Sequence, residues 1–357
     1  MPPRSAIRRR SPQRAAPGFS RYPSSPAVAR STPFPFPDMT SSALCPVCTA
    51  AAEYDFSGRD LMFGLRQRHD YYRCPRCETL FMHPMPAPEV IAGFYPPTYD
   101  IYEEDDREPA PGWWKRVVLQ QRHGYRHLPT GPLAGLLAPL AACFTETTAP
   151  TFVPDGRLLD VGCGNGRFLR TMRSLGWTVN GVEFSDDGVR VCRKAELPVH
   201  HGDLASAAFP DAHFDVITVR HVIEHIPEPQ PFLRELARIL KPGGTLIMET
   251  PNSRALGRQW LSGNWFANEV PRHLFLYNPD ALTLLAEQHG LRRQSLELST
   301  SPKILLNSLD YILQNRGKPS KRIRSRRLLA RLYVWMARRS GKGDVLHARF
   351  VKPAAGG

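Results

Sequence analysis

Apolar residues in the central part of the chain form short runs separated by segments of helical periodicity. These runs fall at 158–161, 178–183, 197–200, 214–219, 245–249 and 294–298. Short apolar runs bounded by turn residues are typical of strands in a parallel sheet, and amphipathic segments between them are typical of crossover helices. The pattern therefore predicts an α/β fold with a doubly wound sheet. A seventh strand is not evident from the pattern.

The first run leads into a glycine-rich turn. Residues 158–169 read LLDVGCGNGRFL, with an acid two residues ahead of glycines at 162, 164 and 166. A turn that binds a pyrophosphate has the spacing G-x-G-x-x-G, and an acid at this place would repel a phosphate. Asp160 would instead suit a ligand that carries an ammonium group, with the glycine backbone lying flat against it. An ordinary strand-to-helix turn is the alternative, and the acid and the flanking strand pattern weigh against it.

This arrangement resembles the first motif of the class I S-adenosylmethionine-dependent methyltransferases. The segments FDVI at 214–217, EH at 224–225 and LKPGG at 240–244 strengthen the resemblance, which then extends from 157 to 250. It implies a Rossmann-like methyltransferase domain, for which we expect the bounds 151–300, and S-adenosyl-L-methionine as the methyl donor. Within that class the chain resembles bacterial enzymes of the small-molecule and glycan type, which are related to the ubiquinone-biosynthesis methyltransferases.

The resemblance also implies which residues would hold the cofactor, namely Asp160, Gly162, Gly164, Gly166, Glu183, Asp203 and Leu204. Asp160 and the glycine turn would hold the methionine part, Glu183 the ribose hydroxyls, and Asp203 the adenine amino group. Glu183 stands 23 residues beyond Asp160, a distance at which an acid at the end of the next strand can reach a ribose in a doubly wound fold. Glu183 and Asp203 could each cap a helix instead.

Ionisable side chains gather just past the run 214–219. His221, Glu224 and His225 stand there, at the carboxyl edge where open α/β sheets bind ligands. In the methyltransferases of ubiquinone precursors and of small-RNA 3′ ends, which this part resembles, an E-x-x-E-H motif with a distant histidine holds a divalent ion. His221 replaces the first glutamate of that motif here. Because imidazole is a poor ligand for a hard cation, we do not favour a divalent metal at Glu224, His225 and His273.

His273 belongs to a long aromatic loop that would overhang the methyl group of the cofactor. In related bacterial methyltransferases a P-R-H-L segment, here 271–274, resembles part of the acceptor side. We therefore expect His273, followed by His221, to be the catalytic residue that removes the acceptor proton. A purely structural pair of glutamate and histidine explains the same residues equally well.

Two C-x-x-C pairs precede the sheet pattern. Cys45 and Cys48 are separated from Cys74 and Cys77 by 25 residues, and both pairs have proline in second place. Four thiolates at this spacing can converge on one tetrahedral zinc ion. We predict a small N-terminal zinc ribbon at 41–83 with these four cysteines as ligands. Its role should be structural, because a site closed by four thiolates leaves no position open for catalysis.

Composition places the basic character of the chain at its two ends. The formal net charge is +14, but residues 39–302 carry 26 basic and 30 acidic side chains. The segment 1–40 is rich in Pro, Ser and Arg, and we expect it to be a disordered basic tail, with Met39 as an alternative start. A stiff proline segment and two helical segments indicate a linker and helical cap at 84–150.

Residues 301–357 are predicted to be a basic helical C-terminal extension. From Arg326 to Arg339 the apolar side chains fall on one helical stripe, formed by Leu328, Leu329, Leu332, Trp335 and Met336. A basic helix with Trp and Leu on one face can lie on an anionic membrane, and the same face could equally pack on its own domain. No apolar run is long enough to cross a bilayer. We expect a cytoplasmic protein, with peripheral contact to the inner membrane face as the further option.

These features predict S-adenosylmethionine-dependent methyl transfer. The body of the chain is slightly acidic and the loop near the cofactor is aromatic, which favours O-methylation of a sugar, a glycan or another small metabolite, lipid-linked acceptors included. The zinc ribbon and the basic ends make RNA the second choice of acceptor, with binding that weakens as salt rises. The third interpretation is a cofactor-binding protein that has lost its chemistry.

Overall fold

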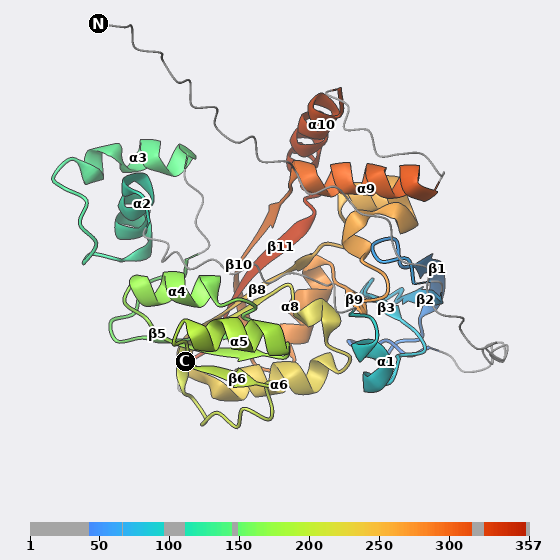
Figure 1. The fold of residues 1–357 in the computed structure, drawn as a ribbon, viewed down its shortest axis with the longest axis horizontal. Coiled ribbons are helices and arrows are strands. Elements are labelled where there is room, and N and C mark those ends of the chain that lie inside the picture. Colours follow the sequence, from blue (N-terminus) through green and yellow to red (C-terminus); the bar gives the residue numbers. More distant parts are fainter. Residues whose placement is uncertain (1–42, 66, 96–110, 145–148, 316–324, 355–357) are drawn as a thin grey trace, which may run out of the picture. The chain divides into compact units, whose positions relative to one another are not determined.

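The computed structural model describes residues 43–65, 67–95, 111–144, 149–315 and 325–354. By their contacts these residues belong to one unit. A sheet of seven strands and a sheet of four strands organise them (Figure 1). The expected tail 1–40 and the alternative start Met39 lie outside the described residues.

The seven-stranded sheet runs in the order β10 (Arg292–Ser299), β11 (Val345–Val351), β8 (Leu240–Pro251), β7 (Phe214–Arg220), β4 (Arg157–Val161), β5 (Thr178–Glu183) and β6 (Val199–His201). The five strands from β8 to β6 are parallel to one another. β11 is antiparallel to both of its neighbours. The chain order reverses between β4 and β7, so the carboxyl ends of these two strands form the crevice where such sheets bind ligands.

Helices cover both faces of this sheet. α4 (Arg167–Ser174) and α5 (Asp186–Lys194) pack on one face, and α6 (Pro229–Ile239) and α8 (Pro279–Glu287) pack on the other. Successive strand residues alternate between the faces, so that Leu158 joins the cluster with α4 and Leu159 the cluster with α6. The arrangement confirms the predicted doubly wound, Rossmann-like fold.

The seventh strand, β11, lies inside the sheet between β8 and β10. The sequence analysis placed its residues in a helical extension, and the expected boundary at 300 cuts through this sheet. Leu346, Ala348 and Phe350 are buried on one face, while His347 and Arg349 between them are half-buried. This alternation of apolar and polar residues was the signal for a strand, but it follows a long basic segment and is only seven residues long.

The cap consists of α2 (Trp113–His123) and α3 (Ala134–Phe144), which pack against each other. The segment between α2 and α3 is fixed to the sheet domain by Tyr125, whose hydroxyl accepts a hydrogen bond from Trp177 Nε1 at 3.0 Å. Trp113 donates through Nε1 to the carbonyl of Thr130 at 2.8 Å. Trp113 therefore has a packing role within the cap.

The cysteine-containing segment forms the four-stranded sheet. Its strands are β1 (Glu53–Arg59), β2 (Arg68–Arg73) and β3 (Leu80–Met82), followed by the short helix α1 (Pro88–Ala92). The fourth strand, β9 (Phe275–Leu276), comes from the aromatic loop some 190 residues later and pairs with β3. The ribbon and the predicted acceptor loop therefore share one sheet.

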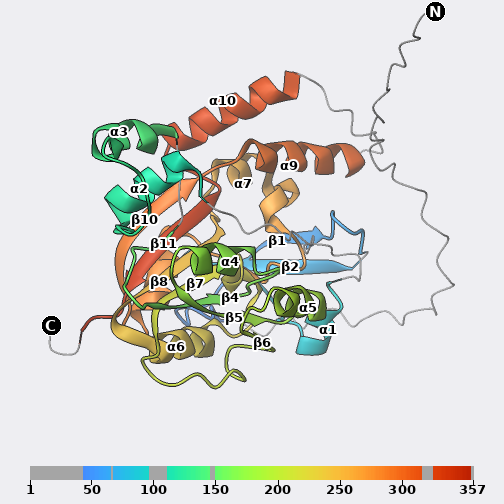
Figure 2. The ribbon, with the colours of Figure 1, turned by 60° about the vertical axis from the view of Figure 1, so that its left-hand side comes forward.

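α10 (Ser325–Arg339) turns its predicted apolar stripe outward. Its buried side chains, Ala330, Tyr333 and Ala337, pack with α7 (Leu256–Leu261) and α9 (Pro302–Asn315), which lies beside α10 in Figure 1 and Figure 2. Four side chains of the stripe are 46 to 73% exposed, namely Leu328, Leu329, Leu332 and Trp335. Met336, the fifth side chain of the stripe, packs against this cluster. The helix therefore packs on its own domain and leaves most of the predicted stripe exposed. No helix in the described part of the chain is long and apolar enough to span a membrane.

Candidate active site

The glycine turn between β4 and α4 requires glycine for two reasons. Gly162, Gly164 and Gly166 have φ angles of 70°, 56° and 70°, the left-handed region that other residues rarely adopt. A Cβ on Gly162 would also lie 2.4 Å from Val222 Cγ2, and one on Gly166 would lie 2.4 Å from Leu197 Cδ1. The turn therefore packs directly against the segment that follows β7.

Asp160 lies at the buried end of β4 and holds an arginine. Its Oδ1 accepts a hydrogen bond from Thr218 Oγ1 at 2.6 Å, and its Oδ2 accepts one from Arg220 Nη2 at 3.1 Å. Burial raises the pKa of Asp160, and the charge of Arg220 opposes that shift. The guanidinium of Arg220 also lies 3.7 Å from the ring centroid of Phe168. Asp160 thus contacts a cation of its own chain where the sequence predicted a ligand's ammonium group.

The two other acids predicted for the cofactor lie at the end of β5 and just after β6, and both accept backbone hydrogen bonds. Glu183 is buried, and its Oε2 accepts from the N–H of Gly164 at 2.7 Å. Asp203 is exposed, and its Oδ1 accepts from the N–H of Ser206 at 2.7 Å. Leu204 beside it is buried. Glu183 therefore ties β5 to the glycine turn, whereas Asp203 closes a local turn.

A cavity of about 280 Å³ opens beside the glycine turn. Cys163 and Asn165 of the turn line it together with Phe168. The charged side chains in its lining are three cations, namely Lys115 from α2, Arg167 and Arg220, and the lining has no carboxylate. The cavity is therefore a place of positive potential at the carboxyl ends of β4 and β7.

A histidine and a glutamate form a pair just past β7. Glu224 is fully buried, accepts a hydrogen bond from Thr250 Oγ1 at 2.9 Å, and lies 3.3 Å from Nδ1 of His221. Burial alone would raise the pKa of Glu224, but the hydrogen bond and charge of His221 and the charges of neighbouring histidines lower it to about 2. An ionised carboxylate only accepts hydrogen bonds, so Nδ1 of His221 carries a proton and Nε2 is left as the basic nitrogen.

The position of His221 is fixed by its backbone. Its φ angle is 54°, a left-handed conformation that is costly for a residue with a side chain and is often found at functional sites. Its N–H donates to the carbonyl of Glu249 at 2.8 Å. The side chain is 52% exposed. Burial of the ring lowers its pKa, but Glu224 and Glu249 outweigh this effect and the net pKa is raised.

Two more histidines and an acid lie behind this pair. His273 is buried, donates through Nδ1 to a backbone carbonyl at 2.9 Å, and has Nε2 at 3.5 Å from Glu269 and 4.0 Å from Glu224. Its burial lowers its pKa. Nδ1 of His225 likewise lies 2.9 Å from a backbone carbonyl. Ligand atoms of Glu224, His225 and His273 lie within 4.8 Å of one another, as a cation site requires.

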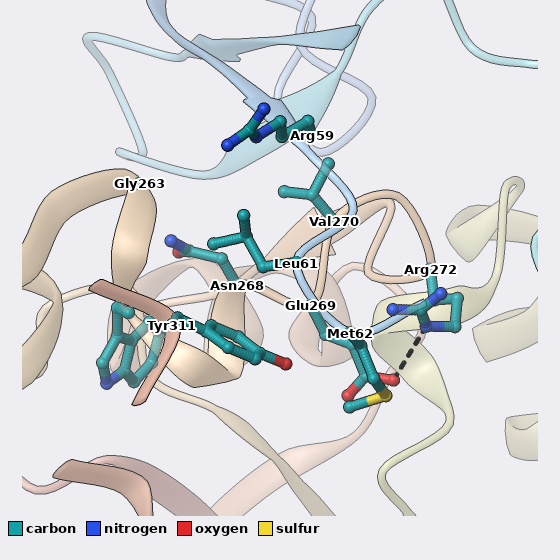
Figure 3. A pocket seen from close by; sticks show the side chains of 10 residues that line it. Arg59, Leu61, Met62, Gly263, Asn268, Glu269, Val270, Arg272 and Tyr311 are labelled. Atoms are coloured by element: carbon teal, nitrogen blue, oxygen red, sulfur yellow. Dashed lines mark hydrogen bonds and ion pairs between the residues drawn. The ribbon is translucent and has the colours of Figure 1, made fainter. Parts of the chain in front are cut away.

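The loop that carries His273 is held by the ribbon. Arg272 contacts both carboxylate oxygens of buried Asp60 at 3.1 Å. Its Nε donates to Glu269 at 3.0 Å, the contact dashed in Figure 3. Tyr71 of β2 donates its hydroxyl to the carbonyl of His273 at 2.7 Å. The hollow drawn in Figure 3, beside Glu269 and Arg272, has a volume of about 10 Å³. It has room for about one water molecule and no acceptor.

The four cysteines of the ribbon converge. Cys45 Sγ lies 3.5 Å from Cys77 Sγ, and Cys48 Sγ lies 3.4 Å from Cys74 Sγ. All four sulfur atoms lie within 4.8 Å of one another. Zinc–thiolate bonds of about 2.3 Å in a tetrahedron would place the sulfurs about 3.8 Å apart. The cluster is therefore compatible with one zinc ion.

The chain is similar to known methyltransferases. A family model described as a methyltransferase domain matches residues 135–296. A ubiquinone biosynthesis O-methyltransferase of Methylococcus capsulatus is 30% identical over 185 residues, which are 47% of this chain and 77% of the relative. The protein of that name from Ralstonia nicotianae is 30% identical over 171 residues, 44% of this chain and 71% of the relative. The chain belongs to the class I S-adenosylmethionine-dependent methyltransferases. A methyltransferase of known structure from Archaeoglobus fulgidus is 20% identical, with 66% of this chain and 99% of that one covered and a TM-score of 0.42.

The structure of this methyltransferase sorts the predicted site residues into two groups. Asp160, the glycine turn and Glu183 lie together at the ends of β4 and β5, while Asp203 closes an exposed turn. His221 and His273 both lie near Glu224, but only His221 is exposed. The sequence analysis missed three residues of these groups, namely Thr218, Arg220 and Glu269.

A signal existed for one of the missed residues. A charged side chain directly after the buried run 214–219 is unusual, and Arg220 stands there. Thr218 lies within an apolar run, where a hydroxyl is common. Glu269 belongs to a loop whose path depends on the ribbon, so its sequence position gave no indication of its neighbours.

Proposed function

We propose that this methyltransferase methylates a hydroxyl oxygen of a small acceptor, a sugar or another metabolite. The relatives named above are O-methyltransferases, and a hydroxyl must lose its proton when its oxygen is methylated. The observation that carries the proposal is the pair of His221 and Glu224, which offers an oriented and half-exposed base. The residues on either side of His221 contact Asp160 and approach Gly162, so the base lies beside the glycine turn.

S-adenosylmethionine supplies the activated methyl group in this proposal. The chain fits such a ligand because the cavity at the glycine turn is open and because Nε of Arg220 is buried without a hydrogen-bond partner among the described residues. Asp160 and the glycine turn would lie at the methionine part, Glu183 at the ribose, and Asp203 with Leu204 at the adenine. Holding the acceptor oxygen in line with the methyl group would supply most of the rate enhancement.

His221 would take the proton that the acceptor oxygen loses. Nε2 receives the proton, and the Glu224 carboxylate stabilises the resulting imidazolium through its contact with Nδ1. His273 was the first choice from the sequence, but it is only 4% exposed, whereas the side chain of His221 is 52% exposed. The geometry therefore supports His221 over His273 as the base.

A divalent cation is the second candidate role for the buried cluster. Glu224, His225 and His273 would be its ligands, and Glu269 beside His273 supplies the further carboxylate that the sequence motif lacks. Both histidines present Nδ1 to backbone carbonyls, which is how metal-bound histidines are commonly oriented. A bound cation would supply Lewis-acid polarisation of the acceptor hydroxyl.

We also propose that the ribbon holds a structural zinc ion through its four cysteines. The sulfur positions support this, because they already lie near tetrahedral spacing. The ribbon shares its sheet with β9 and hydrogen-bonds the His273 segment. Its role in this proposal is to fix the acceptor loop.

The outward stripe of α10 supports peripheral binding to an anionic membrane and, with it, a lipid-linked acceptor. Leu328, Leu332 and Trp335 are exposed one helical turn apart. All charged side chains of the helix are arginines, Arg331, Arg338 and Arg339 among them. If two copies of the chain met through this face, their arginines would face and repel one another, which disfavours a dimer here.

Vesicle sedimentation tests this surface. The full chain should bind vesicles with phosphatidylglycerol far more strongly than pure phosphatidylcholine vesicles, and Leu332→Glu with Trp335→Glu should remove most of that binding. Leu136→Glu, at an exposed leucine of α3, is the matched control and should bind as the wild type does. Equal binding by all three proteins, or no binding, would reject the membrane contact.

Label transfer tests the proposed reaction. Methyl-tritiated S-adenosylmethionine is incubated with the chain and a lysate, and the products are separated into nucleic acid, protein, polar metabolites and lipids. Counts in the metabolite or lipid fraction support the proposal. Nuclease-sensitive counts would replace it with RNA methylation, and bound cofactor without counts in any fraction would favour a protein that has lost its chemistry.

A further inference from the structure

We propose that Arg220, with Lys115 and Arg167 near it, forms the subsite for the carboxylate group of S-adenosylmethionine, and that Asp160 acts by positioning Arg220. The inference rests on the proposed cofactor site and names the chemistry at one end of it. It also changes the role of Asp160, which the sequence analysis assigned to the ammonium group of the ligand.

Arg220 is held on two sides. Its Nη2 lies 3.1 Å from Asp160 Oδ2, and its guanidinium carbon lies over the Phe168 ring, 3.7 Å from the ring centroid. Asp160 is itself fixed by Thr218 and is 1% exposed. An arginine that is fixed in this way loses little further freedom when it binds a carboxylate. The buried pair is therefore preorganised for an anion.

Arg220 also has a donor left for a ligand. Its Nε is buried and makes no hydrogen bond to any described residue. A buried donor without a partner is costly, and a carboxylate is an acceptor that would satisfy it with a charge-assisted bond. The side chain is 27% exposed and lines the cavity beside the glycine turn. A ligand in that cavity can therefore contact the Arg220 side chain.

The charge of the cavity selects the carboxylate over the other groups of the ligand. The charged side chains that line it are Lys115, Arg167 and Arg220. The methionine part of S-adenosylmethionine carries a sulfonium, an ammonium and a carboxylate, and the first two would be repelled by three cations. The ammonium group would also have to displace Arg220 to reach Oδ2 of Asp160. The carboxylate is the group that this cavity attracts.

Calorimetry with two ligands tests the subsite without relying on turnover. The full chain is titrated with S-adenosylmethionine and with decarboxylated S-adenosylmethionine, which differ only in the carboxylate. The wild type should bind the first about 10- to 100-fold more tightly, the range expected for charged hydrogen bonds. In Arg220→Met that ratio should fall to about 1, through lost affinity for S-adenosylmethionine alone. Arg220→Lys should keep part of the discrimination.

Controls separate this inference from the proposed function. Arg234→Met, at an exposed arginine of α6, should leave both affinities unchanged. Equal affinities in the wild type, or full discrimination in Arg220→Met, would overturn the subsite. Tighter binding of both ligands by Arg220→Met would show instead that Arg220 competes with the ligand for Asp160. If neither ligand binds the wild type, the cofactor site itself is wrong. The wild-type comparison remains decisive even if Arg220→Met does not fold.

Discussion

The proposed cofactor side and the proposed acceptor side of this methyltransferase are built in different ways. The cofactor side takes Asp160, the glycine turn and Glu183 from one continuous stretch of strand, turn and helix. The acceptor side takes Glu224 from the turn after β7 and His273 from a loop that the ribbon holds. Contacts of Asp160 on the first side reach residues up to 60 positions away, whereas those on the second side join segments about 200 residues apart. We therefore expect damage to the ribbon to affect the acceptor chemistry before cofactor binding.

Loss of the zinc site should have the largest effect. Cys74→Ser would remove one of four proposed ligands, and structural zinc in small domains contributes about 10–16 kcal/mol to folding. We expect elemental analysis to show that zinc falls from one ion per chain to nearly none, with a large drop in melting temperature and no methyl transfer. Cys192→Ser, outside the ribbon, should keep its zinc. Unchanged stability and transfer in zinc-free Cys74→Ser would break the proposed link between ribbon and acceptor loop.

Breaking the buried ion pair between ribbon and loop should come next. Asp60→Asn leaves the buried guanidinium of Arg272 without one of its two carboxylates. Removing one partner of a buried pair costs about 3–5 kcal/mol, which denaturant unfolding would measure. Asp280→Asn is the matched control, because the pair of Asp280 and Arg254 is largely exposed and should cost less than about 1 kcal/mol. Equal losses in the two variants would mean that the ribbon and the loop are not coupled through this pair.

A smaller effect, with a defined pH dependence, is expected at Asp344. Burial raises its pKa to about 6 against the hydrogen bonds of Tyr333 and Trp265. The folded state therefore binds the proton more tightly than the unfolded state, whose pKa is about 3.8. The bound proton makes its full contribution to the free energy of unfolding below pH 3.8, and this contribution is lost as the pH rises through 6. The shift amounts to about 3 kcal/mol.

Denaturant unfolding at several pH values would measure this contribution. The wild type should lose about 2 kcal/mol relative to Asp344→Asn between pH 4 and pH 7, because at pH 4 the unfolded state is still partly protonated. The two unfolding curves should otherwise follow the same pH dependence. A difference in unfolding free energy that stays constant with pH would show that the pKa of Asp344 is not raised in the folded protein.

The sequence predicted the strand, the glycine turn and the following helix of the proposed cofactor side because their information is local. The acid, the glycines and the flanking apolar runs lie within 30 residues, and each glycine is required by a positive φ at that position. The same holds for the cysteine pairs, whose spacing alone brings four sulfurs together. Local patterns of this kind determine which residues meet without knowledge of the rest of the fold.

The remaining features depend on packing that no local pattern describes. The pairing of two-residue β9 with β3 gave no periodic signal. The apolar stripe of α10 was visible, but small residues, Ala330 and Ala337, form its buried face and turn the stripe outward. The contact between Arg220 and Asp160 joins side chains from two strands 60 residues apart. The sequence could assign each of these residues to a helix or strand, but it could not predict which distant residue each one contacts.

The most direct test of the account compares methyl transfer and cofactor affinity in His221→Ala. The acceptor is the fraction that the wild type labels, and His213→Ala, at the opposite end of β7, is the control. Loss of a general base lowers transfer by about 10²- to 10⁴-fold, and we predict this loss with an unchanged dissociation constant for S-adenosylmethionine. Wild-type transfer by His221→Ala, together with its loss in a folded His273→Ala variant, would contradict the account and return the base to the buried cluster.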